Sequence, residues 1–307
     1  MKQIISASRR TDIPAYYSEW LIRRLKAGFV MVQQPFSQKY FPVSLQPETV
    51  GAIVLWSKNY SPLLPRLELI EQTTKNFFFH FTITGHAELE SNAPDYTDAV
   101  KDFIFISKRY SPKQLVWRFD PICITDKLSF ELHEERFLNC ARLLKGHATR
   151  CFVSFVHPYK KVITNIKQDT NHALARLTDT VKKDFARKLA SHAQRYGIRM
   201  HACCNDFLVS DTIGKASCIN GHSLSELFHT PFSKQAASLR KECACTKSID
   251  IGEYNTCPQG CVYCYATIDK KQAMTVHQRH NPDWNSLGGD IPETELTMQK
   301  KQASFPY

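Results

Sequence analysis

Short apolar segments alternate with segments of helical periodicity through the first two-thirds of the chain. Strands are expected at residues 3–6, 29–33, 52–56, 77–84, 115–119, 151–156 and 198–203. Helices are expected between them, at residues 16–26, 63–71, 99–110, 129–144 and 171–196. Strands that are apolar along their whole length, each followed by a helix, indicate a parallel sheet covered on both faces. The pattern predicts an α/β fold, a full or partial (β/α)8 barrel of the TIM type.

The alternation ends near Asp206, and the chain divides there into predicted parts. Residues 1–205 are expected to form the βα barrel portion. Residues 206–280 are rich in cysteine and are expected to pack on the barrel mouth as a metal-cluster region. Residues 281–307 are polar, with Pro and Gly, and are interpreted as a C-terminal tail on the surface.

Composition and charge limit the class of protein and its partners. The chain has 307 residues, 43% of them hydrophobic, and no apolar run near the ~20 residues of a membrane span. Its first residues do not resemble a secretory signal, so we expect a cytoplasmic protein that does not bind membranes. A net charge of +11 is compatible with an anionic partner, such as nucleic acid or a phosphorylated metabolite. No motif of a nucleic-acid-binding module supports the first of these.

Eight of the eleven cysteines fall between Cys203 and Cys264. In a reducing compartment such a group favours metal ligation over disulfides. Cys257, Cys261 and Cys264 have the spacing C-x3-C-x2-C, which can hold three irons of a cubane cluster and leave the fourth iron open to a ligand. The alternative is a zinc site, in which the Cys261–Cys264 pair shares the ion with Cys243 and Cys245.

The other five cysteines of this region are Cys203, Cys204, Cys218, Cys243 and Cys245. Cys218, Cys243, Cys245 and one of the pair Cys203–Cys204 are expected to hold a second iron–sulfur cluster or a zinc ion. Two alternatives stay open. Some of the five are buried thiols beside the first cluster, or Cys243 or Cys245 completes that cluster in an electron-transfer protein.

Polar side chains follow the predicted strands, at the end of a barrel where functional groups lie. The candidates for catalysis are Arg9, Arg10, Asp12, Arg118 and Asp120. The arginines either bind a carboxylate or phosphate in bidentate fashion, or form ion pairs that brace the strand ends. Thr82 and Thr84 end another strand and are expected to face the same mouth as cofactor-binding residues.

The segment 257–264, Cys-Pro-Gln-Gly-Cys-Val-Tyr-Cys, resembles the cluster loop of radical S-adenosylmethionine (SAM) enzymes. That loop has a C-x3-C pair and an aromatic residue, here Tyr263, before the third cysteine. Residues 8–14, 117–122 and 248–254 also resemble a bacterial family filed as domain of unknown function 1848, whose C-terminal cysteine loop has been likened to that of radical SAM enzymes. This second resemblance extends over residues 4–266.

The resemblance implies a specific chemistry. Cys257, Cys261 and Cys264 would hold a 4Fe–4S cluster, SAM would bind its open iron, and Tyr263 would lie near the adenine. An electron from a donor such as flavodoxin or ferredoxin would cleave SAM, and the 5′-deoxyadenosyl radical would abstract hydrogen from a substrate. Two departures stand out. The loop follows the last predicted strand instead of the first, and no Gly-rich segment matches the usual contact to the SAM amino group.

The sequence therefore predicts a radical SAM-type 4Fe–4S enzyme with an unknown, anionic or neutral substrate. A closed barrel brings first and last strands together, so a loop at either end can reach one mouth. The alternative is a non-enzymatic zinc or iron–sulfur protein whose basic surface binds nucleic acid.

Overall fold

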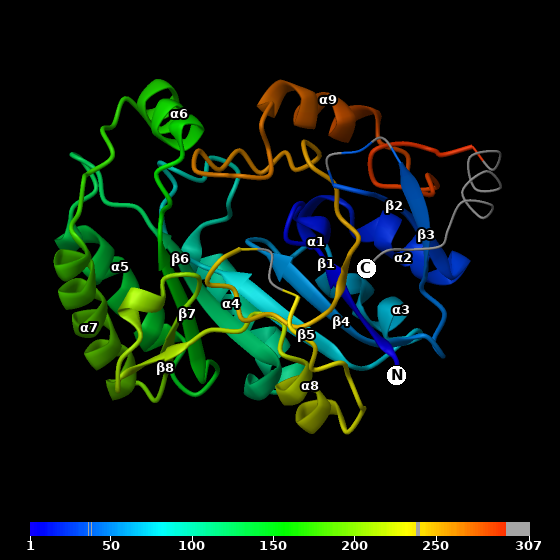
Figure 1. Cartoon of the computed structure of the whole chain (residues 1–307), viewed down its shortest axis with the longest axis horizontal. Helices are drawn as coiled ribbons and strands as arrows, with labels where there is room; N and C mark the ends of the chain where they lie inside the picture. The colour runs from blue at the N-terminus through cyan, green and yellow to red at the C-terminus, as the bar shows by residue number, and fades with distance from the viewer. Residues whose placement is uncertain (36, 38, 238–239, 293–307) are drawn as a thin grey trace.

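The main element of the fold is a single sheet of eight parallel strands (Figure 1). The computed structural model describes residues 1–292 except 36, 38 and 238–239, so the predicted tail at 281–307 lies outside the described residues from 293 onward. The strand order is β10-β1-β4-β5-β6-β7-β8-β9. The strands are β1 Gln3–Ala7, β4 Val50–Ser57, β5 Phe77–Thr82, β6 Leu115–Ile122, β7 Arg150–Phe155, β8 Arg199–Ala202, β9 Ile213–Lys215 and β10 Ile249–Asp250.

Helices connect most of these strands, as the apolar pattern predicts. The α-helices are α1 Ile13–Tyr16, α2 Ser18–Ala27, α3 Leu67–Glu71, α4 Tyr96–Arg109, α5 Phe130–Leu143, α6 Lys160–Thr170, α7 Asp179–Arg195, α8 Gly221–Phe228 and α9 Lys270–Arg279. Single 3-10 turns occur at η1 Leu64–Arg66, η2 Pro112–Gln114 and η3 Asp206–Leu208. No helix of the described part of the chain is long and apolar enough to cross a membrane.

Two predicted elements differ from the structure for local reasons. The strand expected at 29–33 forms as β2 Phe29–Gln33, but it pairs with β3 Tyr40–Ser44 in a separate antiparallel hairpin. The long helix expected at 171–196 begins only at Asp179. Asn171 ends the preceding helix α6 in a left-handed conformation with φ +54°, and the Thr178 side chain caps α7 by accepting from the N–H of Val181.

The two faces of the sheet bury different apolar clusters. One face packs against the connecting helices, with large buried side chains such as Phe79, Trp117 and Phe137. The other face, which includes Phe78 and Phe152, packs against the segment 216–245, with Cys218, Ile219, Leu224 and Phe232 among its contacts. Figure 1 shows this yellow segment, with α8, crossing in front of the strands.

This covering segment accounts for the difference from a complete barrel. The edge strands β9 and β10 are not paired with each other, and no sheet closes among the described residues. The described residues of the segment 216–245 cover one face of the sheet and bury side chains such as Val54, Phe78 and Phe152. The protein is therefore a mixed α/β structure with a large open parallel sheet.

Candidate metal and cofactor site

A cavity of about 890 Å³ lies at the carboxyl ends of the strands. All eight cysteines between Cys203 and Cys264 line it. So do most of the other candidates from the sequence, namely Arg9, Arg10, Asp12, Thr82, Arg118, Asp120 and Tyr263. Thr84 is the exception, since it is buried behind this wall at 1% exposure. The structure thus brings both groups of thiols, Cys203–Cys245 and Cys257–Cys264, to one space.

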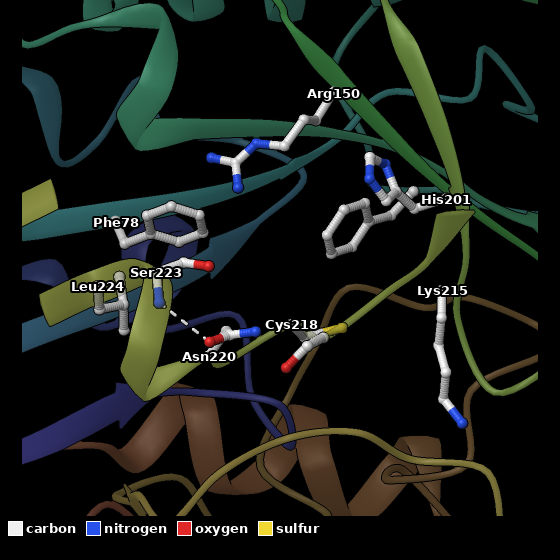
Figure 2. A pocket seen from close by; sticks show the side chains of 10 residues that line it. Phe78, Arg150, His201, Lys215, Cys218, Asn220, Ser223 and Leu224 are labelled. Carbon is white, nitrogen blue, oxygen red and sulfur yellow. Dashed lines mark hydrogen bonds between the residues drawn. The ribbon is translucent and has the colours of Figure 1, made fainter. Parts of the chain in front are cut away.

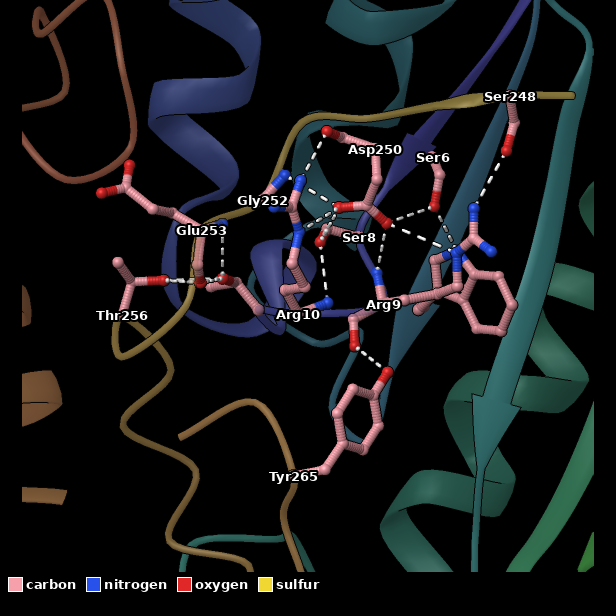
Figure 3. A network of polar contacts seen from close by, with 12 residues as sticks. Ser6, Ser8, Arg9, Arg10, Ser248, Asp250, Gly252, Glu253, Thr256 and Tyr265 are labelled. Atoms are coloured by element: carbon pink, nitrogen blue, oxygen red, sulfur yellow. Dashed lines mark hydrogen bonds and ion pairs between the residues drawn. The ribbon is translucent and has the colours of Figure 1, made fainter. Parts of the chain in front are cut away.

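The strand β10 carries the cysteine loop to this cavity. It pairs in parallel with β1, so that Ser6 lies opposite Asp250. The Asp250 carboxylate accepts from the hydroxyls of Ser6 and Ser8 at 2.9 and 2.6 Å, and from the N–H of Arg9 at 2.8 Å (Figure 3). The loop after β10 therefore leaves the sheet next to the loop after β1. The pairing of β10 with β1 brings the two loops together, although the sheet does not close into a barrel among the described residues.

Asp250 also holds both predicted arginines. Its carboxylate lies 3.5 Å from Arg9 Nε and 3.3 Å from Arg10 Nε. Burial alone would raise the pKa of Asp250, but Arg10 and Arg9 outweigh it and lower that pKa below its usual value. Figure 3 shows the two guanidinium groups turned toward this carboxylate. Their geometry favours the interpretation in which they brace the strand ends.

The loop 257–264 and the residue before it are fixed by contacts from two other segments, around Tyr17 and at residues 91–92. Tyr17 donates its hydroxyl to the carbonyl of Thr256 at 2.5 Å, and Asn92 donates to the carbonyl of Pro258 at 2.8 Å. Gly260 has φ +78°, and a Cβ there would lie 2.5 Å from the hydroxyl oxygen of Ser91. Only glycine fits this turn without strain, so its backbone sets the spacing between the first two cysteines.

Backbone N–H groups point at two of the loop sulfurs. The N–H of Asp12 lies 3.5 Å from Cys257 Sγ. The N–H groups of Ala266 and Thr267 lie 3.3 and 3.4 Å from Cys264 Sγ. Such N–H···S contacts orient thiolate ligands and adjust the redox potential of the metal that the thiolates bind.

Without metal, burial keeps the thiols of Cys257 and Cys261 protonated at neutral pH, because it raises the pKa of each. Burial, with Asp12 and Cys264 nearby, raises the pKa of Cys257 to about 12. Burial also raises the pKa of Cys261, although the nearby Lys58 cation opposes the rise. Metal binding must therefore displace protons here, because thiolates and not thiols are ligands.

A buried carboxylate, Glu90, connects the aromatic residue of the loop to the strand ends. It is 3% exposed and lies 3.0 Å from Lys58 Nζ. It accepts hydrogen bonds from the Tyr263 hydroxyl and, at 2.7 Å, from the Thr84 hydroxyl. The Lys58 cation also lies 5.7 Å from the centre of the Tyr263 ring. Thr84 thus positions Glu90 and does not reach the cavity itself.

Gln259 lies in the loop between the first two cysteines and has unmet hydrogen-bonding capacity. The residue is 3% exposed and lines the large cavity. Both its Nε2 and its Oε1 are buried without a hydrogen-bond partner among the described residues. A buried amide left in this state is costly, which points to a ligand that completes it.

The other five cysteines form a closed ring of neighbouring thiols. Cys203 Sγ lies 3.4 Å from Cys218 Sγ, and Cys218 contacts Cys245. Cys245 contacts Cys243. Cys204 completes the ring with contacts to both Cys243 and Cys203. Both members of the Cys203–Cys204 pair belong to the ring.

Arg118 supplies positive charge to this thiol ring. Its Nη1 lies 3.2 Å from Cys218 Sγ, and its Nη2 lies 3.9 Å from Cys203 Sγ. The same guanidinium pairs with Asp120, which also accepts from the hydroxyl of Ser154. Arg118 therefore joins a carboxylate and two thiols at the end of β6.

A preformed site for a single metal ion is not found. No group of three or more His, Cys, Asp or Glu side chains is arranged to hold one ion in the described part of the chain. A zinc site needs four ligands that converge on one point. In a cubane cluster each thiolate binds a different iron, so its ligands surround a larger volume.

The chain matches the family model described as a domain of unknown function, DUF1848, over residues 4–266. It belongs to this family. The matched region of this DUF1848 chain includes both cysteine groups and every strand of the large sheet. No curated protein matches the chain.

One solved structure is similar over nearly the whole DUF1848 chain. It is the carboxyl transferase domain from Rhizobium etli pyruvate carboxylase with 3-hydroxypyruvate, at 10% identity and a TM-score of 0.30. The match covers 98% of this chain and 53% of that one, so the chain spans about half the length of that structure. A likeness at this TM-score supports no conclusion about fold or function.

Four residues of the DUF1848 site were not among the sequence candidates: Lys58, Glu90, Asp250 and Gln259. Lys58 follows a predicted strand, so its position after β4 was a usable signal. Gln259 lies inside the cluster loop, although its type alone does not indicate a ligand contact. Glu90 lies in an irregular segment, where no pattern places it beside Tyr263.

Proposed function

We propose that the protein is a radical SAM-type iron–sulfur enzyme in which Cys257, Cys261 and Cys264 hold a 4Fe–4S cluster. The observation that carries the proposal is one cavity lined by this loop and by a buried amide, Gln259, without a partner. A catalytic metal centre needs an open position facing a space for its ligand. The open sheet would serve as a partial (β/α)8 barrel, with its mouth at the strand ends.

The donor set fits the proposed cofactors. Three thiols on one loop leave one iron of the cluster for SAM, and a cavity of about 890 Å³ has the size of a site for a large small-molecule ligand. When bound, the cluster and SAM together would supply one-electron reduction and a carbon radical. Everything else must come from the side chains and backbone of the chain.

The chain's own residues would orient the cluster ligands, bind SAM and hold an aromatic ring at the cavity wall. The N–H groups of Asp12, Ala266 and Thr267 donate to the sulfurs of the loop. The Gln259 amide offers one donor and one acceptor, which suit the carboxylate and ammonium groups of an amino acid. Glu90 fixes the hydroxyl of Tyr263 and so holds its ring at the cavity wall.

The thiol ring is proposed as a second metal centre, an iron–sulfur cluster or zinc. Five thiols exceed the four that one centre needs, so one of Cys203 and Cys204 is free to act as a spare or exchange ligand. Arg118 would offset part of the negative charge of the bound thiolates. The electron donor would be a cytoplasmic flavodoxin or ferredoxin, and the substrate is of unknown class.

The test is reconstitution with iron and sulfide without oxygen, followed by reduction in the presence of SAM. We expect 5′-deoxyadenosine in the product mixture and a change in the EPR signal of the reduced cluster when SAM is added. Cys261→Ala is the matched inactive variant, with Cys140→Ala on α5 as a control cysteine outside the cavity.

Two results would contradict the proposal. One is a reduced cluster whose EPR spectrum ignores SAM and yields no 5′-deoxyadenosine. The other is protein that contains about two zinc ions per chain and no acid-labile sulfide, which identifies the alternative, a zinc-stabilised protein without this activity.

A further inference from the structure

A second cavity, of about 120 Å³, lies between the sheet and the segment that covers it, on the face that includes Phe78 and Phe152. It is nearer the amino ends of β5 and β7 than the large cavity is. Its polar lining comes from Arg150, His201, Lys215, Ser217, Asn220 and Ser223 (Figure 2). In Figure 2, Arg150 and His201 lie on one side of the space, with Asn220 and Ser223 at the start of α8 on the other. No Asp or Glu is among its lining residues in the described part of the chain.

Arg150 is the most unusual group in this cavity. Its guanidinium donates one hydrogen bond, to the carbonyl of Lys113 at 2.6 Å, and lies 5.2 Å from the centre of the Phe78 ring. Burial lowers the pKa of Arg150, and no charged group among the described residues offsets this effect. A partly buried cation without an anion is unfavourable, because its lost hydration is not replaced.

Four other partly or fully buried arginines have a carboxylate partner. The buried Arg24 has none, but it donates to the backbone carbonyl of Asp283, and the Asp283 and Asp290 charges oppose the lowering of its pKa by burial. Arg9 and Arg10 pair with Asp250, Arg118 pairs with Asp120, and Arg136 pairs with Glu88. The anion that would complete Arg150 in the same way is not supplied by the cavity walls. A ligand from solution would supply it.

The other polar groups of the cavity add hydrogen-bonding capacity. The Nδ1 atom of His201 is buried without a hydrogen-bond partner among the described residues. The ring is held by β9, since a Cβ at Gly214 would lie 2.7 Å from it. Asn220 accepts from the N–H of Ser223 through its oxygen, which turns its amide nitrogen toward other partners. Lys215 is already paired with Asp206 at 2.6 Å.

We propose that this cavity binds one small oxyanion, inorganic phosphate or sulfate, through Arg150 and the side chains of His201, Asn220 and Ser223. A guanidinium matches two oxygens of a tetrahedral oxyanion with parallel hydrogen bonds. The volume of about 120 Å³ fits a single such group and excludes a nucleotide. The inference is independent of the proposed enzymatic function.

The bound anion would connect the sheet to the segment that covers it. Arg150 belongs to β7 and His201 to β8, while Asn220 and Ser223 belong to the covering segment. Cys218, a member of the thiol ring, lines both cavities. Phosphate binding should therefore stabilise the segment that carries this thiol.

The test is equilibrium dialysis of the full chain, purified without oxygen, against radiolabelled phosphate at constant ionic strength. We expect one saturable site per chain, competition by sulfate, and a melting temperature that rises with phosphate but not with chloride. Arg150→Met should weaken phosphate binding about tenfold or more, because it removes charge-assisted hydrogen bonds. Arg195→Met, the same change at an exposed position of α7, should leave the affinity unchanged.

His201→Gln is the second variant, and it keeps the test decisive if Arg150→Met does not fold. It should weaken binding severalfold. The inference is overturned if the wild-type chain shows no saturable phosphate binding. It is also overturned if binding is unchanged in the folded variants, because the anion then belongs to the arginines of the large cavity.

Discussion

The backbone N–H of Asp12 lies 3.5 Å from the sulfur atom of Cys257, although 245 residues separate them. The contact joins the loop after β1 to the cysteine loop after β10. It rests on the pairing of these two strands, in which Ser6 lies opposite Asp250. The surroundings of the loop sulfurs are therefore set by the first residues of the chain as much as by the loop itself.

Removing Cys243 and Cys245 together should abolish the second metal centre and leave the first. In the double variant Cys243→Ser/Cys245→Ser, we expect a loss of about four irons per chain if the ring holds a cubane cluster. A loss of about one zinc is expected if it holds zinc. Iron, zinc and sulfide analysis of protein purified without oxygen measures this. Unchanged metal content, compared with Cys140→Ala, would show that the ring is a group of buried thiols.

Gln259→Leu should weaken SAM binding about tenfold or more and leave the iron content unchanged. The leucine keeps the volume but removes a donor and an acceptor, and hydrogen bonds to charged groups contribute about 1.5–3 kcal/mol each. Equilibrium dialysis of reconstituted protein with labelled SAM gives the affinity.

The control for this prediction is Gln194→Leu, at an exposed position of α7. If the wild-type protein binds SAM and Gln259→Leu binds it equally well, Gln259 has no role in that contact. If the wild-type protein does not bind SAM, the proposed function itself is wrong.

Lys58→Met should destabilise the fold by about 3–5 kcal/mol, because it leaves the buried Glu90 carboxylate without its cation. The double variant Lys58→Met/Glu90→Leu should lose less than the sum of the two single changes. Urea unfolding followed by circular dichroism gives the free energies for this cycle. Lys101→Met, which breaks the exposed pair with Asp98, is the control and should leave the free energy of unfolding nearly unchanged, because water screens this pair. Additive effects at Lys58 and Glu90 would mean that the two groups do not interact.

The buried His133 should make the protein less stable as the pH falls through the range from about 6.5 to about 4. Burial lowers the pKa of His133 from 6.5 to about 4. Between these two pH values the unfolded chain binds more protons at His133 than the folded protein does. The folded protein therefore has its full stability above pH 6.5 and loses part of it as the pH falls toward 4. The ring nitrogens explain the preference for the neutral form: Nδ1 faces the carbonyl of Ser129 at 2.9 Å, and Nε2 accepts from the N–H of Cys123 at 3.3 Å.

The full effect of His133 is of order 3 kcal/mol, from about 1.4 kcal/mol per pKa unit. Unfolding free energies measured from pH 7 to pH 4 should show a smaller pH dependence for His133→Gln than for the wild type. His222→Gln, at an exposed position of α8, is the control and should follow the wild-type curve. Parallel curves for wild type and His133→Gln would refute the assignment.

The sequence predicts the central strands well, because β4, β5, β6 and β7 are apolar along most of their length and each forms within a few residues of its expected bounds. The two edge strands, β9 and β10, are not predicted from the sequence. The strand β9 has three residues and β10 has two, one of them the acidic Asp250. Their positions depend on pairing with distant segments and, for β10, on ion pairs with Arg9 and Arg10. No local pattern contains that information.

The sequence predicts only part of the candidate site, because the rest depends on contacts between residues far apart in the chain. Cysteine spacing and count identify the loop and the second group without any knowledge of the fold. The closure of the five thiols into a ring needs the covering segment to lie on the sheet, which the sequence does not reveal. Glu90 and Gln259 are found only from burial and from missing hydrogen-bond partners.

The short strand β10 also fixes the order of events during biosynthesis. The walls of the large cavity come from residues near both ends of the matched region, and Asp250 must reach β1 before the loop is in place. A ribosome-bound chain that lacks β10 has the first cysteines of the large cavity, Cys203 and Cys204, without the wall that later covers them. Enclosure of the cysteines is thus a late step, and the newly made chain is most vulnerable to oxidation just before it.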